Sequence, residues 1–448
     1  MGDSPQALTI RNCDALIDGD VVPKRDIHIV DRRIAAIDAA AEHEVENDVA
    51  TGDSQVIDGS GLLAMPGLIN GHTHAAMTLL RGAAEDVPIE SWFNDRVWPI
   101  EVNVTESDVH LGTLLACAEM IQAGVTSFAD HYFHEHHAAR AVVESGLRAN
   151  LGMTFFSSQG RAGLDASIEF VDTWHGAADG RITASLAPHA TYTCTDDDLR
   201  AAAEAASARG VRVHIHAAES LDQTNHALAE RGITPIGTLA ETGILDTGVL
   251  IAHGCGIVES DLALLAGNAA NIGVAHCPKT YMKLAINPLT PIRELREIGV
   301  AVGLGTDGPA SCNCIDLFEN MRLTALAQKY SAVDATWLTV AEALHLAGPE
   351  SARLMGAEVG RVAVGALADI ILVDLSGLHC QPVHDPRAAL VYSARAADVR
   401  TTIVAGEPLM IDRELLTIDV AELQAAVRQR APQLMNFDAT KSIQTYNT

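Results

Sequence analysis

The sequence predicts an α/β protein, namely a (β/α)₈ barrel of the TIM type with a small β-sandwich domain that is formed by both chain ends. Three observations predict it. The chain has 448 residues, of which 48 % are hydrophobic and 35 are glycine, so it is long enough for a barrel with a large core and a companion domain. Eight apolar runs alternate with amphipathic stretches in the middle of the chain. Short β-rich runs occupy both ends.

The first part of the β-sandwich is expected in residues 1–64. Its strand-like runs are broken by turn residues and read LTIRNCDALIDGD, DIHIVDRRIAAID and VIDGSGLLAM. Matching runs return in residues 358–430, in VGRVAVGALADIILVDL and VRTTIVAGEPLMID. We therefore expect the two ends to form one small domain, followed by a tail over residues 431–448.

The barrel is expected in residues 65–357. Its eight candidate strands are the runs LAMPGLINGHTH, GVTSFADHYF, RANLGMTFF, ITASLAPHA, VRVHIHAAE, GVLIAHGCG, NIGVAHCPK and VAVGLGTDG. Helical stretches such as ESDVHLGTLLACAEMIQAG and TDDDLRAAAEAASARG separate them. This alternation is typical of a parallel sheet, and eight such units close into a barrel.

Chemically active side chains follow the apolar part of several strands. They are His72, His74, His216, His253 and Asp307. A barrel gathers its strand ends and the following loops at one mouth, where the active site lies. The order of the sequence therefore predicts one site on this rim.

Two histidine pairs have the spacing of metal ligands. In a strand, residues two apart share a face, so His72 and His74 can reach one cation, and His214 and His216 repeat the pattern. Glu219 follows the second pair, and Asp307 adds an oxygen ligand to a sphere that suits Zn²⁺ or Fe²⁺. The competing interpretations are core histidines without a metal and a buried aspartate that caps a turn.

Composition narrows the class of partner. The formal net charge is −28, which argues against binding to phosphate backbones and leaves a solvated acidic surface as the simplest interpretation.

The first residues, MGDSPQALTI, have neither the pattern of a signal peptide nor that of a myristoylation site, and no apolar run is long enough to span a bilayer. Eight scattered cysteines are expected to be reduced. We expect a cytoplasmic protein without nucleic-acid or membrane partners.

Four segments resemble one family. PGLINGHTHAAMTLLRG, VHIHAAES, AHCPKTYMKLA and LGTDGPASCNCIDLFENMR are similar to signatures of the amidohydrolase superfamily, in its methylthioadenosine and S-adenosylhomocysteine deaminase branch. The resemblance runs in order from about residue 7 to residue 420. It implies a metal-dependent aminohydrolase that converts an adenosine-type nucleoside to its inosine analogue and ammonia, and a homo-oligomer.

The resemblance also implies a metal site. One divalent ion, Zn²⁺ before Fe²⁺, would be held by His72, His74, His216 and Asp307, with a water in the open position. Asp307 would accept the proton of that water. Glu219 would protonate the ring nitrogen beside the attacked carbon, and His253 would hydrogen-bond the attacking water.

Further residues are expected to bind substrate. His189 in LAPHATYTC resembles a position that contacts the base or the sugar, and Glu101 in ESWFNDRVWPIE resembles the acceptor of the ribose hydroxyls. The structural alternatives are a core histidine bonded to backbone for His253 and a surface glutamate for Glu101. The resemblance assigns no specific role to His276. The histidine-rich HYFHEHH segment (residues 131–137) is expected to be a polar rim loop and not a second metal site.

The pocket departs from the family pattern at three positions. Met153 aligns where an arginine usually meets the carboxylate of homocysteine, and Arg161 is expected to substitute for it. KTYMKLA, with Tyr281, replaces the usual SNLKL, and Cys312 stands where Asn is common. Loss of the arginine favours a substrate with an apolar 5′ group, such as methylthioadenosine or 5′-deoxyadenosine.

Two other functions stay open at this point. The first is a hydrolase of the same fold that acts on guanine, cytosine, a pterin or a chloro-triazine, because the fold does not fix the substrate. The second is a barrel without catalytic activity. The presence of every expected ligand argues against the second, and Glu219 argues against dechlorination.

Overall fold

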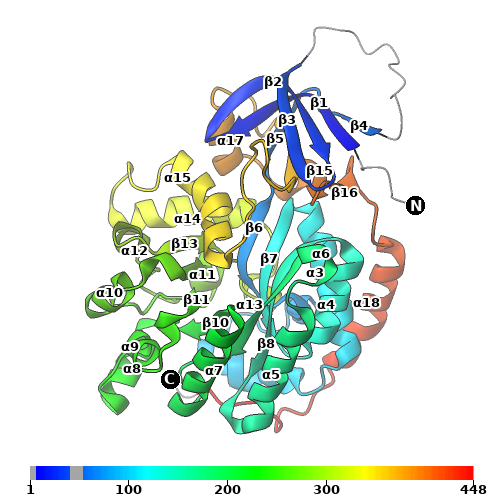
Figure 1. Ribbon diagram of the computed structural model, residues 1–448. Coiled ribbons are helices and arrows are strands. Elements are labelled where there is room, and N and C mark those ends of the chain that lie inside the picture. The colour runs from blue at the N-terminus through cyan, green and yellow to red at the C-terminus, as the bar shows by residue number, and fades with distance from the viewer. Residues whose placement is uncertain (1–6, 41–53, 447–448) are drawn as a thin grey trace.

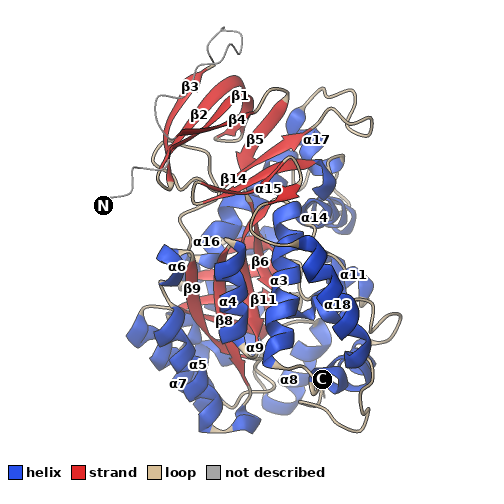
Figure 2. Ribbon diagram, turned by 90° about the vertical axis from the view of Figure 1, so that its right-hand side faces the viewer, coloured by secondary structure: helices blue, strands red, loops and turns tan. Residues whose placement is uncertain are grey.

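The computed structural model describes residues 7–40 and 54–446, which form two sheets with helices around one of them (Figure 1). Residues 1–6, on which the expectation about the leader sequence depends, lie outside the described residues, as do residues 41–53 and 447–448. In Figure 2, the sheet that contains β1, β2 and β3 lies at the top, and the sheet that contains β8 and β9 lies below it among helices.

The eight-stranded sheet has the order β13-β12-β11-β10-β9-β8-β7-β6, and every neighbouring pair in it is parallel. Its strands are β6 (Leu68–Thr73), β7 (Val125–Tyr132), β8 (Arg148–Phe155), β9 (Ile182–Pro188), β10 (Arg212–Ala217), β11 (Gly248–His253), β12 (Ile272–His276) and β13 (Ala301–Leu304). They coincide with the eight apolar runs of the sequence.

The two outer strands of this sheet approach each other where they end. The backbone N–H groups of Thr306 and Asp307, just after β13, donate to the carbonyl oxygen of His72 in β6, at 3.1 and 3.0 Å. Gly305 permits this approach, because a Cβ atom at that position would lie 2.8 Å from Cys277 Sγ and 3.0 Å from His72 O. The sheet is therefore a nearly closed barrel, and its closing contact lies beside the expected metal ligands.

The barrel strands are buried on both faces, as all eight residues of β7 illustrate. Helices cover the outside of the barrel (Figures 1 and 2). The main ones are α3 (Glu106–Gln122), α4 (Glu135–Ser145), α5 (Arg161–Trp174), α7 (Asp196–Arg209), α8 (Leu221–Arg231), α9 (Pro235–Glu241), α10 (Glu259–Ala266), α11 (Pro278–Lys283), α12 (Ile292–Glu297), α14 (Leu317–Ala332), α15 (Val340–His345) and α16 (Ser351–Met355).

The helix starts follow the local sequence. The Thr105 side chain caps α3 by accepting from the Asp108 N–H, and the Asp108 carboxylate accepts from the Thr105 N–H, which completes a capping box. Thr195, Ser220 and Thr339 cap α7, α8 and α15 in the same position. These caps fix where each of the four helices begins.

Both chain ends build the second sheet, which has nine strands and the order β17-β16-β15-β14-β5-β1-β2-β3, with β4 paired to β1. The strands are β1 (Ala7–Ile17), β2 (Asp20–Val30), β3 (Arg33–Ala39), β4 (Ser54–Asp58), β5 (Leu62–Pro66), β14 (Ile370–Asp374), β15 (Val399–Val404), β16 (Glu407–Ile411) and β17 (Glu414–Leu415). The pairing of β5 with β14 joins the two ends, as expected.

A buried ion pair connects this sheet region to the barrel. Arg148, at the start of β8, donates to both carboxylate oxygens of Asp369 at 2.9 and 3.1 Å, and Asp369 also accepts from the Ala405 N–H at 2.8 Å. Such a bidentate pair fixes direction as well as distance. It lies at the end of the barrel opposite the expected active site.

The predicted fold is confirmed: a nearly closed barrel of eight parallel strands and a sheet made by the chain ends. The exact domain borders stay predictions. Helices α17 (Pro386–Tyr392) and α18 (Val420–Leu434) lie in the segment expected to be β-rich, and α18 crosses the expected border at residue 430.

Within the described part of the chain, no helix combines the length and apolar character needed to cross a bilayer.

Candidate metal centre and active site

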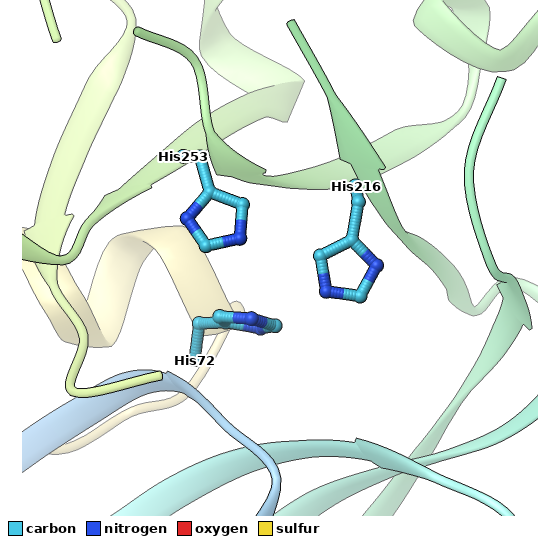
Figure 3. A group of neighbouring side chains, drawn as sticks. All are labelled: His72, His216 and His253. Atoms are coloured by element: carbon cyan, nitrogen blue, oxygen red, sulfur yellow. The ribbon is translucent and has the colours of Figure 1, made fainter. Parts of the chain in front are cut away.

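Five side chains from four strand ends face one space inside the barrel mouth. His72 lies in β6, His216 lies in β10, His253 ends β11, and His74 and Asp307 follow β6 and β13. Figure 3 shows the rings of His72, His216 and His253 turned toward a common centre. The structure thus brings together all four predicted metal ligands and one predicted catalytic histidine.

The distances among these groups suit a single cation. Asp307 Oδ1 lies 3.6 Å from His72 Nε2 and 3.3 Å from His74 Nε2. His74 Nε2 lies 3.3 Å from His216 Nε2. Overlapping sets of three ligand atoms within 4.8 Å of one another include His72 with His216 and His253, and His72 with His74 and Asp307.

Three of the histidines have their Nδ1 atoms engaged elsewhere. His72 Nδ1 lies 2.9 Å from His214 Nε2, while His74 Nδ1 lies 2.6 Å from the carbonyl oxygen of His131. His216 Nδ1 lies 2.8 Å from the carbonyl oxygen of His189. Such outer bonds are typical of metal-bound histidines, since they fix the ring and leave the other nitrogen for the metal. Each of the three rings therefore presents Nε2 to the centre.

His253 differs from these three rings. Its Nδ1 is buried and has no hydrogen-bond partner among the described residues. The residue has a φ of 77°, a left-handed conformation that is uncommon outside glycine, and Asp307 has a φ of 63°. Backbone strain of this kind concentrates at functional sites. The missing outer bond favours a water- or substrate-facing role for His253 over a ligand role.

Burial and neighbours set the protonation of the two acids. Burial alone would raise the pKa of Asp307, but the imidazoles of His72 and His74, 3.6 and 3.3 Å from its Oδ1, hold that pKa well below its usual range. Burial, together with the charge of Asp307, raises the pKa of Glu219 to about 8. One carboxyl group is thus a proton acceptor at neutral pH, and the other is a proton donor.

The candidate centre opens into a cavity in the barrel mouth. One part of the cavity wall is polar and includes His74, His216, His253, Glu219 and Asp307. Much of the remaining wall is apolar: Met77, Trp92, Phe93, Trp98, Phe133, Phe156, Tyr192, Leu284 and Ile443.

Glu101 and His189, both predicted to bind substrate, line this cavity. The Tyr132 hydroxyl donates to Glu101 Oε1 at 2.6 Å, and burial raises the pKa of Glu101 to about 7 in spite of that bond. His189 Nδ1 lies 2.9 Å from Thr193 Oγ1, and its ring packs 4.7 Å from that of Phe156. Their substrate contacts stay predictions.

Two residues that were considered for the substrate tail lie elsewhere. Arg161 begins α5, its side chain is 67 % exposed, and it pairs with Asp165 at 2.8 Å, so the structure does not bring it to the cavity. Met153 packs against the apolar core outside the cavity. The alternation of β8 explains this, because the next residue, Thr154, takes the inward position and lines the cavity.

Tyr281 and Cys312, the other two departures from the family pattern, lie behind the site. The Tyr281 hydroxyl accepts from the Cys277 N–H at 2.8 Å, and its ring packs at an angle of 68° against that of His253. Cys312 is buried with Sγ 3.7 Å from the Asp307 carbonyl oxygen, and His276 Nδ1 lies 3.0 Å from Thr290 Oγ1. Tyr281 and Cys312 thus lie behind His253 and Asp307.

The HYFHEHH segment is only partly a rim loop. His136 and His137 pair with Glu169 and Glu106 at 3.1 and 3.2 Å near the surface. His131, in contrast, is buried, lines the cavity and lies 2.8 Å from Thr154 Oγ1 through Nδ1. The assignment of His131 to a polar loop was wrong, because it belongs to the end of β7. The rule that found His72, a histidine at a strand end, would also have found His131.

Comparison with known proteins places the chain among characterised relatives. Residues 63–409 match the amidohydrolase family. A 5-methylthioadenosine/S-adenosylhomocysteine deaminase of Pelotomaculum thermopropionicum is 44 % identical over 383 residues, or 85 % of this chain and 88 % of that protein. A 5′-deoxyadenosine deaminase of Methanosphaera stadtmanae is 36 % identical over 426 residues, or 94 % of this chain and 98 % of that protein.

Among solved structures, an adenosine deaminase from Xanthomonas campestris with bound zinc superimposes with a TM-score of 0.87 at 30 % identity. The match covers 95 % of this chain and 98 % of that one. The similarity therefore extends over both the barrel and the sheet formed by the chain ends.

Proposed function

The chain belongs to the amidohydrolase family, and from this premise we propose that it is a metal-dependent aminohydrolase that deaminates an adenosine-type nucleoside to the inosine analogue and ammonia. One observation carries the proposal. The carboxyl group of Glu219, protonated at neutral pH, lines the same cavity as His74, His216 and Asp307. Hydrolytic attack on an amino-substituted ring requires a proton donor beside the metal centre.

The residues fit one divalent cation. His72 Nε2 is buried without a hydrogen-bond partner among the described residues, although it lies only 3.6 Å from Asp307 Oδ1. Three imidazole nitrogens and one carboxylate oxygen form a donor set that suits zinc. We propose His72, His74, His216 and Asp307 as the ligands, and zinc as the metal, since the similar adenosine deaminase of Xanthomonas campestris holds zinc.

When bound, such a cation lowers the pKa of a coordinated water toward neutrality and so supplies the nucleophile. Asp307 is ionised at neutral pH and would accept a proton from the attacking water. Glu219 would donate its proton to the ring nitrogen next to the attacked carbon, which keeps negative charge from building on the heterocycle. The proton held by Asp307 would then pass to the amino group, which leaves as ammonia, and the new hydroxyl group would return a proton to Glu219 as it becomes the carbonyl group.

His253 and His189 orient the reactants in this proposal. His253, whose Nδ1 has no protein partner in the described structure, hydrogen-bonds the attacking water. Burial lowers the pKa of His253 to about 3, so the ring is neutral and can accept as well as donate. His189 lies against the ring of Phe156 at the cavity wall, where the base would be placed.

Glu101 accepts the hydroxyl groups of the ribose. Its carboxyl group is buried at the cavity wall and oriented by Tyr132, which leaves its second oxygen for the diol. A dideoxy analogue that lacks both hydroxyls should therefore bind more weakly than adenosine to the wild type. The same analogue and adenosine should have similar KM values in Glu101→Gln, and an unchanged preference in that variant would contradict this role.

The cavity wall favours an apolar 5′ group. Among the described residues that line it there is no lysine or arginine. A homocysteine tail would bring a carboxylate without a cationic partner, and burying an unpaired charge is costly. We therefore propose methylthioadenosine and 5′-deoxyadenosine as better substrates than S-adenosylhomocysteine.

The test is ammonia release from a panel of aminated rings by the zinc-loaded protein. The panel contains methylthioadenosine, 5′-deoxyadenosine, adenosine, S-adenosylhomocysteine, guanine, cytosine and melamine. Turnover of the adenosine analogues, with the ultraviolet shift from adenine to hypoxanthine, is expected. Activity confined to free bases or triazines would overturn the substrate, and no ammonia from any compound would overturn the proposed reaction.

A further inference from the structure

The segment after α18, residues 435–446, returns to the mouth of the barrel. Helix α18 packs against α3, where Arg430 pairs with Asp108, and the chain then crosses toward the strand ends. Figures 1 and 2 both place this end of the chain at the side of the barrel that is remote from the nine-stranded sheet. We call residues 435–446 the closing segment.

Tyr446 fixes the closing segment at the cavity. It is 2 % exposed, and its ring stacks on Phe93 with a centroid distance of 4.8 Å and an angle of 12°. It also meets Tyr192 edge to face at 5.7 Å. The side chain of Asn94 accepts from the Tyr446 N–H at 2.8 Å and donates to the Tyr446 carbonyl oxygen at 3.0 Å. Phe93 and Tyr192 are themselves cavity residues.

This attachment places Ile443 in the cavity wall. Ile443 packs in one apolar cluster with Trp92, Phe93 and Leu284, which line the same cavity. The cavity therefore has a polar end with the metal centre and an apolar end that the closing segment completes. The segment reaches the site from more than one hundred residues beyond the last barrel strand, so the pattern of the barrel motifs gives no sign of it.

We propose that Ile443 determines substrate specificity by forming the wall of a subsite for the apolar 5′ substituent, and that Tyr446 is the positioning residue that holds it there. This inference rests on the proposed function. If the base lies at the metal centre and the ribose at Glu101, the 5′ group must occupy the remaining part of the cavity. That part is lined by Trp92, Phe93, Leu284 and Ile443.

The first test compares two substrates that differ only in the 5′ group. Ile443→Ala should raise the KM for methylthioadenosine about tenfold, because several methyl and methylene contacts are lost, and should change the KM for adenosine far less. Thr440→Ala is the control in the same segment, since Thr440 is exposed and its hydroxyl donates to Asp438. Equal changes for both substrates, or no change for either, would overturn the inference.

The second test reverses the preference. Ile443→Arg places a cation at the apolar end, where it can pair with the carboxylate of a homocysteine tail. The ratio of kcat/KM for S-adenosylhomocysteine to that for methylthioadenosine should rise at least about tenfold. A ratio equal to that of the wild type would contradict a 5′ subsite at Ile443.

The third test separates positioning from general stability. Tyr446→Ala should reproduce the selective rise in the KM for methylthioadenosine with a smaller effect on kcat, and Tyr446→Phe, which keeps the stacked ring, should return that KM toward the wild-type value. A loss of kcat for both substrates would overturn the positioning role. If the wild type deaminates neither nucleoside, the proposed function fails; if it deaminates both and the variants show no selectivity, only this inference fails.

Discussion

His214 Nε2 lies 2.9 Å from His72 Nδ1, and both rings are fully buried. The two imidazoles meet nearly edge to face, at an angle of 75°. Because this contact engages Nδ1 of His72, it turns Nε2 toward Asp307 and the proposed metal centre. His214 is therefore an outer partner of the centre, although its position in VHIHAAES would also fit a ligand.

Replacement of His214 should weaken metal binding without abolishing it. For His214→Leu we expect a loss of zinc affinity of about 10–100-fold, which is typical when an outer partner of a ligand is removed. Competition with a chelator measures this affinity. The control is His226→Ala, at an exposed position on α8. Complete loss of zinc would assign His214 a direct ligand role instead.

Glu219→Gln should separate chemistry from metal binding. The variant removes the proton donor but leaves the ligands intact, so we expect a fall in kcat of about 10²–10⁴-fold with normal zinc content. Glu259→Gln, an exposed site at the start of α10, is the matched control. Near-normal turnover of the Glu219 variant would refute its assigned role.

The pH dependence of kcat should also reflect Glu219. Burial raises the pKa of its carboxyl group to about 8, and only the protonated form can donate to the ring. We therefore expect kcat to be constant below that pH and to fall tenfold per pH unit well above it. A pH profile of the wild type measures this alkaline limb. A rate that rises steadily above pH 8 would contradict proton donation by Glu219.

Glu101 should lower stability as the pH rises. Burial raises its pKa from 4.5 to about 7, so the unfolded state ionises first and unfolding becomes more favourable between these values. The shift corresponds to roughly 3 kcal/mol, which is fully present as a cost above pH 7 and absent below pH 4.5. Glu101→Gln removes it and can still accept from Tyr132.

Urea unfolding of wild type and Glu101→Gln at pH 5 and pH 8 measures this effect. The variant should gain stability relative to the wild type as the pH rises. A difference that is independent of pH would mean that Glu101 stays ionised in the folded state. The Tyr132→Phe variant should enlarge the pH-dependent cost in the wild-type background, since the Tyr132 hydroxyl stabilises the carboxylate.

The strands and most of the site could be predicted because they obey local rules. His72, His74 and His216 lie at the ends of apolar runs, and the period of two in a strand places pairs of side chains on one face. Asp307 follows the last run by the same rule. Since parallel strand ends meet at one rim, order in the sequence was enough to bring these residues together.

Other features depended on information that the local pattern does not contain. Met153 and Thr154 are adjacent, so an error of one residue in register exchanges the inward and outward positions. Arg161 was expected to substitute for the missing arginine, but it begins α5, where Asp165, one helical turn away, pairs with it. The closing segment reaches the cavity through tertiary packing of α18 on α3, and no periodicity in residues 435–446 indicates that contact.

The most direct measurement is the rate of methylthioadenosine deamination, followed by ultraviolet absorbance, as zinc is added to metal-free protein. The proposed centre has one set of ligands, so the rate should rise linearly and saturate at one zinc per chain. His72→Ala should show no zinc-dependent rise. A wild-type protein that produces no hypoxanthine analogue at any zinc ratio, or whose activity is unaffected by complete removal of metal, would contradict a metal-dependent deaminase.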